Sequence, residues 1–85
     1  MAYRLFFKAS VTKDLKRIGQ EAARRILKDI REKLLPDPRI GKPLKGKDGI
    51  LWSFRAGDYR VLYTFSDKDL IVLVVRIGHR REIYR

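Results

Sequence analysis

The sequence has no cysteine and only one histidine among its 85 residues. Without cysteine the chain has no disulfide framework, no thiolate nucleophile and no thiolate ligand for a metal. One histidine with scattered carboxylates does not predict a zinc or calcium site either. We therefore expect neither a metal nor a cofactor. The lack of cysteine also fits a reducing compartment, and we expect a cytoplasmic protein.

Long apolar runs are missing as well. The longest, Leu70 to Val75, is far shorter than the stretch of about 20 apolar residues that spans a bilayer. A Gly-rich loop followed by Lys and Ser or Thr, typical of nucleoside triphosphate binding, does not occur. None of the three serines lies in a nucleophile-elbow context, so we discount a serine–histidine–aspartate triad.

Negative charge is scarce relative to positive charge. Lys and Arg number 21 against 10 Asp and Glu, which gives a formal net charge of +11. Such an excess causes self-repulsion, and it is typical of proteins that bind nucleic acid, an anionic membrane or an acidic protein. Hydrophobic residues make up 45%, too many for a disordered tail. The composition predicts one folded domain, residues 1–85, that binds a polyanion.

The first half of the chain predicts one strand and two helices. The strand is expected over residues 3–8, and the first helix over 10–18 with Ser10 as its N-cap. A second helix over 20–35 ends before two prolines. Its outer face is basic and its apolar face is needed for the core, so we expect no membrane role. The buried stripe predicted by its helical spacing consists of Ala23, Ile26, Leu27, Ile30 and Leu34.

The second half predicts strands. After a basic connection over residues 36–49, strands are expected over 50–55, 59–65, 70–77 and, at the end, 82–85. Gly78 is expected to end the third of these, whose aliphatic composition is typical of a central strand covered on both faces. The order indicates an α+β fold, with an N-terminal strand, two helices on one face, and an antiparallel sheet of three to four strands.

Arg60 is a charged residue in the middle of an apolar strand pattern. Alternation places it on the opposite face from Tyr59, Val61, Tyr63 and Phe65. Two interpretations remain open. Arg60 either faces an edge or forms an ion pair, with Asp58 or Glu82, or it projects into a concave surface that must be positive.

The segment after the aliphatic strand is dense in groups that move protons or bind phosphate. Cleavage of RNA without metal needs a base for the 2′-hydroxyl, cations for the phosphate and an acid for the leaving 5′-oxygen. Arginine matches phosphate by bidentate donation and stays charged. A solvated tail and plain strand packing are the alternative interpretations. The residues concerned are His79, Arg80, Arg81 and Tyr84.

These residues give the chain its resemblance to a known family. The segment 52–85 resembles the RelE/ParE superfamily of bacterial and archaeal toxins, and within it the RelE branch. The match rests on residues 54–63 (FRAGDYRVLY), on the aliphatic strand, and on residues 77–80 (IGHR) followed by Ile83-Tyr84. The N-terminal strand and the helical pair fit too, so the resemblance extends over essentially the whole chain.

The resemblance implies a compact α+β fold, similar to microbial ribonucleases, and cleavage of mRNA in the ribosomal A site without metal. Arg60 and Arg80 would stabilise the phosphate or donate a proton, and Tyr84 would stack on or deprotonate the nucleotide. His79 beside them would act directly or orient the RNA. Further RNA contacts are expected from Arg55, Lys45, Lys47 and Arg81.

The resemblance also implies partners. They are an acidic cognate antitoxin, the ribosome with its 16S rRNA, mRNA, and operator DNA that the toxin contacts only through the antitoxin complex, in which it acts as co-repressor. The RelE branch carries lysines on the strand before the hairpin, whereas this strand reads Leu51-Trp52-Ser53-Phe54. A non-catalytic protein that binds RNA or an antitoxin therefore stays open. A ParE-like gyrase inhibitor is a further alternative, although the resemblance at His79, Arg80 and Tyr84 argues against it.

Overall fold

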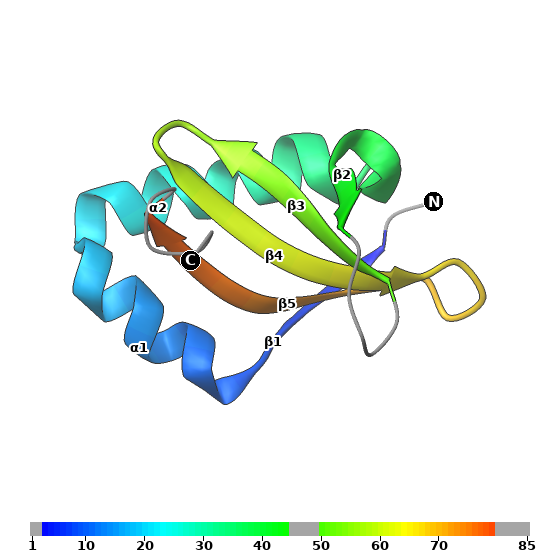
Figure 1. The fold of residues 1–85 in the computed structure, drawn as a ribbon, viewed down its shortest axis with the longest axis horizontal. Helices are drawn as coiled ribbons and strands as arrows, with labels where there is room; N and C mark the ends of the chain where they lie inside the picture. The colour runs from blue at the N-terminus through cyan, green and yellow to red at the C-terminus, as the bar shows by residue number, and fades with distance from the viewer. Residues whose placement is uncertain (1–2, 45–49, 80–85) are drawn as a thin grey trace.

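A computed structural model describes residues 3–44 and 50–79. Figure 1 shows a sheet with α2 crossing behind it. None of the helices in the described ranges is long and apolar enough to cross a membrane. In chain order the elements are β1 (Arg4–Phe7), α1 (Ala9–Ile18), α2 (Gln20–Asp29), a π-helical turn (Ile30–Leu34), a 3₁₀ turn (Pro38–Ile40), β2 (Lys42–Leu44), β3 (Leu51–Ala56), β4 (Tyr59–Ser66) and β5 (Ile71–His79).

The α+β class, the N-terminal strand and the two helices are confirmed, but the sheet differs from the prediction. Within residues 3–44 and 50–79 it has five strands, in the order β1-β5-β4-β3-β2. It is mixed and not purely antiparallel, because β1 runs parallel to β5 while the other neighbours are antiparallel. A parallel pair requires a long crossover, and the segment that begins with α1 and α2 supplies it.

Strand β2 lies inside residues 36–49, which the sequence pattern indicated as a connection. The strand has three residues and contains Pro43, so neither length nor propensity marks it. Proline is tolerated there because β2 is an edge strand, with no neighbour on its outer side among the strands that the structure describes. The predicted terminal strand over 82–85 lies outside the described residues.

A β-bulge in β5 changes which side chains reach the core. Leu62 is opposite Arg76 while Tyr63 is opposite Val74, so Val75 is an extra residue on the β5 side. Strict alternation from Val74 would turn Arg76 inward. The bulge turns Arg76 outward and places Ile77, which is 1% exposed, in the core.

The prediction that Gly78 ends this strand is wrong, because backbone pairing with β4 continues through Gly78 to His79. The strand is also not covered on both faces by the described residues. Its side chains Val72 and Val74 are fully buried, whereas Ile71 and Leu73 on the opposite face are half-buried.

The core lies between the helices and one face of the sheet. Ile26, Ile30 and Leu34 of the predicted stripe are buried there, and Leu27 packs at its margin. The second helix continues through a π-helical turn to Leu34, one residue before the predicted end at 35. Helix α1 begins at Ala9, with Lys8 as N-cap. The predicted cap, Ser10, instead donates its hydroxyl hydrogen bond to the carbonyl oxygen of Val75, at 3.4 Å.

Asp14 connects α1 to the end of β5. β1 pairs with β5 only as far as Val74, so the backbone beyond that point has no strand on this side among the described residues. The carboxylate of Asp14, a 7% exposed residue, accepts a hydrogen bond of 3.0 Å from the backbone N–H of Ile77. Asp14 therefore substitutes for the missing strand and holds the segment that leads to His79.

We predict that Asp14→Ala lowers the free energy of unfolding by about 2 kcal/mol, because a buried N–H loses its charged acceptor. Urea denaturation followed by circular dichroism measures the change. The neighbouring exposed variant Lys13→Ala is the control and should change stability by less than about 0.5 kcal/mol. Equal stability of the two variants would contradict the assignment.

Tyr63 anchors the far end of the sheet to the 3₁₀ turn. It is fully buried, and its hydroxyl donates a hydrogen bond to the carbonyl oxygen of Pro38. The rings of Trp52 and Phe65 lie 6.4 and 6.3 Å from its ring. Burial raises the pKa of Tyr63 from 10.0 to about 12, because the charged phenolate is disfavoured away from water.

This shift predicts a loss of stability in alkali. Below about pH 9 both states are protonated and the stabilisation is complete. Between pH 10 and 12 the unfolded chain loses the proton while the folded chain keeps it, so the free energy of unfolding falls by about 1.4 kcal/mol per pH unit. Chemical denaturation from pH 8 to 12 tests this against Tyr63→Phe, in which this titration is removed but lysine titration is unchanged. Parallel stability curves would contradict the prediction.

Candidate functional site

The face of the sheet away from the helices carries cations from four adjacent strands. Phe54 and Val61 are opposite each other and face the core, so the next pair, Arg55 and Arg60, faces outward. In the neighbouring row Lys42 is opposite Ser53, and Leu62 is opposite Arg76. Because directly opposed residues share a face, one surface, here called the cationic face, bears Lys42, Arg55, Arg60 and Arg76.

Arg55 and Arg60 form a pair of like charges directly across two strands. The Nε atom of Arg55 donates to the carbonyl oxygen of Gly57, at 3.2 Å, which holds this guanidinium against the hairpin turn. The Nε atom of Arg60 is shielded from solvent. Like charges in this position destabilise a sheet, and a bound anion would relieve their repulsion. The pair therefore has the electrostatics of an anion site.

A cleft of about 260 Å³ opens beside this pair. Ser53 on its floor is 3% exposed. The backbone of Gly41 lies close to Ser53 and Tyr63. A Cβ atom at position 41 would be 2.6 Å from the carbonyl oxygen of Ser53 and closer still to the Tyr63 hydroxyl. The lining consists of Ile40, Gly41, Lys42, Ser53, Phe54, Arg55 and Arg60. Of the predicted site residues, Arg55 and Arg60 thus come together in one cleft.

His79 lies on the other face of the sheet from Arg60. It is opposite Tyr59, and the two rings meet edge to face with centroids 5.8 Å apart. Arg60 is opposite Gly78 instead, so no β5 side chain directly flanks it. The structure therefore does not bring His79 into the cleft with Arg60, although the two are adjacent in the sheet.

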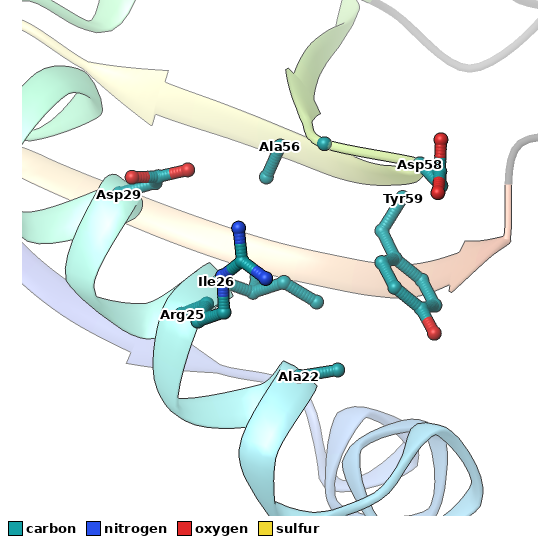
Figure 2. Close-up of a pocket in the computed structure, with 8 residues that line it drawn as sticks. Ala22, Arg25, Ile26, Asp29, Ala56, Asp58 and Tyr59 are labelled. Carbon is teal, nitrogen blue, oxygen red and sulfur yellow. The ribbon is translucent and has the colours of Figure 1, made fainter.

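A second pocket, of about 140 Å³, lies between α2 and the β3–β4 hairpin on the helix side. Figure 2 shows the Arg25 side chain reaching toward this space from α2, and Asp58 and Tyr59 at the hairpin. Its charges are of both signs, because Asp29 and Asp58 line it together with Arg25. It differs in this respect from the cleft on the cationic face, which has cations only.

The segment that leads into β2 is held by a separate network. The Arg39 guanidinium forms an ion pair with Asp67 and lies 5.3 Å from the ring centroid of Phe65. The Tyr3 hydroxyl donates to the second oxygen of Asp67, at 2.6 Å. These contacts from Tyr3 and Arg39 lower the pKa of Asp67. Arg39 is thus neutralised by Asp67.

The remaining predicted site residues lie outside the described ranges: Lys45, Lys47, Arg80, Arg81 and Tyr84. Sequence reasoning missed the contributions of Gly41, Lys42 and Ser53. Their only signal was the glycine and lysine before Pro43, and without the pairing of β2 with β3 nothing connected them to Arg60.

With this geometry the class of protein is clear. The family described as the ParE toxin of type II toxin-antitoxin system, parDE, matches residues 5–84. The chain belongs to this family of toxins. Within it the protein is RelE-like, as its relatives among toxins and solved structures show.

Two toxins of Mycobacterium tuberculosis are similar over nearly the full length. Toxin RelG is 31% identical, over 100% of this chain and 99% of its own length. Toxin RelE is 34% identical, over 98% and 87% respectively. Among solved structures, the RelBE2 toxin–antitoxin complex of the same organism has a TM-score of 0.85 at 28% identity, covering 94% of this chain and 93% of that one. An Escherichia coli RelE mutant has a TM-score of 0.75 at 28% identity, covering 98% and 88%.

We predict that Gly41→Ala destabilises the protein by about 3 kcal/mol, because the added methyl group meets fixed backbone and a buried hydroxyl. Thermal unfolding measures the effect. The matched control is Gly57→Ala, where a Cβ meets nothing within 4 Å and only the positive φ of 63° causes strain, about 1 kcal/mol. If Gly41→Ala is as stable as Gly57→Ala, the contact of position 41 with Ser53 and Tyr63 is not tight.

Proposed function

We propose that this toxin is an endoribonuclease that cleaves mRNA in the ribosomal A site, without a metal. The observation that carries the proposal is the opposed pair Arg55 and Arg60 at the mouth of a cleft with cations only. An RNA phosphate in this cleft gains bidentate contacts from arginine and relieves the repulsion between the two guanidinium groups. The choice of RNA as the polyanion comes from the resemblance to the RelE branch, to which the similar toxins RelG and RelE point as well.

In this proposal the 2′-hydroxyl of the RNA attacks the adjacent phosphate, and the bond to the 5′-oxygen breaks. Arg60 balances the charge that develops on the phosphate oxygens. Arg80 and Tyr84 follow β5 and are assigned, from the family resemblance, to phosphate stabilisation and to stacking or proton transfer. His79 contacts Tyr59 on the opposite face, so we assign it to positioning the end of β5 rather than to the same phosphate.

The partners follow from the charge and from the relatives. Solved structures similar to this chain include a RelBE2 complex, an E. coli RelBE complex and a RelE mutant with an antitoxin RelBc peptide. We propose that an acidic antitoxin binds and neutralises this toxin, and that together they repress their own operator. A net charge of +11 also favours association with ribosomal RNA, by electrostatic steering in the cytoplasm.

We expect Arg60→Ala to reduce mRNA cleavage by about 10²–10³-fold, because a preorganised donor to the phosphate is removed. Inducible expression followed by mapping of mRNA 5′ ends measures the cuts, and growth reports toxicity. Arg17→Ala, an exposed arginine on α1, is the control and should leave both unchanged. If a folded Arg60→Ala protein cleaves mRNA as well as the wild type does, the role of Arg60 is refuted.

A gyrase inhibitor is the second candidate, since the matching family is described by the ParE toxin. Purified protein would then inhibit DNA supercoiling while mRNA in expressing cells stays intact. A protein that only binds RNA or an antitoxin would do neither, and its expression without antitoxin would be harmless. The 5′-end map and a supercoiling assay together separate the three possibilities.

A further inference from the structure

Lys42 lines the cleft because β2 pairs with β3. It lies on β2, directly opposite Ser53 of β3. Opposed residues have Cβ atoms about 5 Å apart, and the diagonal neighbour on the same face, here Arg55, is about 7–8 Å away. Long side chains cover this separation, so Lys42 and Arg55 can reach one ligand. Arg60, on β4, is opposite Arg55 and is the third cation of the group.

The surroundings of Lys42 favour a ligand above the sheet. Ser53 is small and buried, so it leaves the space between Lys42 and the arginines hollow, and the cleft occupies this space. The Lys42 side chain is exposed, and no ion pair connects it to an acidic residue within the described ranges. Lys42 therefore adds a third positive charge to the lining that already contains Arg55 and Arg60.

The position of Lys42 is also fixed. Gly41, immediately before it, packs against the Ser53 backbone and the Tyr63 hydroxyl with no room for a side chain. Pro43, immediately after it, has a restricted φ angle. The turn over Pro38–Ile40 is bound to Tyr63, and Arg39 to Asp67. An ammonium group on such a rigid edge loses less conformational freedom when it binds a ligand than one on a loop.

We propose that Lys42 is a phosphate-binding residue that forms, with Arg55 and Arg60, a three-cation site for the RNA backbone. The assignment of RNA rests on the proposed function. Lys42 acts through its charge, so arginine can replace it but methionine, of similar length, cannot. The competing role is that of an edge-strand lysine that only discourages pairing with other sheets. In that role its loss changes neither RNA affinity nor the salt dependence of binding.

The first experiment measures binding of a 2′-O-methyl RNA oligonucleotide, which cannot be cleaved, between 50 and 300 mM salt (an assay range of about sixfold, chosen to resolve the slope). Each lost phosphate contact to a single strand reduces the slope of log affinity against log salt by about 0.7. We expect this reduction, and about tenfold weaker binding at the lowest salt, for Lys42→Met. Lys42→Arg and the distant control Lys13→Met should retain the wild-type slope.

The second experiment measures mRNA cleavage in a translating extract with the same variants. Lys42→Met should cut at least tenfold more slowly, while Lys42→Arg keeps most of the activity. Circular dichroism checks that each variant is folded. If the wild type does not cleave mRNA but Lys42→Met shows the reduced slope of log affinity against log salt, the proposed function fails and the phosphate site stands. An unchanged slope for folded Lys42→Met, or an equal loss for Lys13→Met, overturns the role of Lys42.

Discussion

The extra residue in β5 is the constraint on which the arrangement of the molecule depends. Because Val75 interrupts the pairing with β4, every later side chain of β5 changes face. Ile77 enters the core, Arg76 joins the cationic face, and Gly78 lies opposite Arg60. Asp14 then accepts the hydrogen bond of Ile77 and fixes this new phase of the strand. The same β-bulge thus determines both the packing of the core and the geometry of the site.

The cationic face shows how stability and binding oppose each other in a small domain. Two opposed arginines and a nearby lysine repel one another, and an ordinary sheet surface would alternate their signs. The molecule does use ion pairing elsewhere, where Asp67 neutralises Arg39 beside the aromatic cluster. The cleft differs from this region, because its lining residues include three cations and no acidic residue.

The site also shows how a positive charge on one surface can come from a different strand. The strand before the hairpin presents Leu51 and Ser53 outward, without lysine, and on that ground the sequence left catalysis in doubt. The neighbouring edge strand places Lys42 opposite Ser53. A cation is thus available above the same part of the sheet, from a residue that is eleven positions earlier in the chain (42 against 53).

The amino-acid sequence by itself determined the α+β class, both helices, the hairpin at Gly57 and the placement of Arg60 on the opposite face from Val61 and Tyr63, because these depend on local periodicity and turn residues. It also indicated the toxin family, through residues 54–63, the aliphatic strand and residues 77–84, and the family match over residues 5–84 confirms this. Only the tertiary structure decided the parallel pairing of β1, the existence of β2, the bulge at Val75 and the separation of His79 from Arg60. These features depend on which distant strands pair and in what register, and no local pattern of side chains encodes that choice.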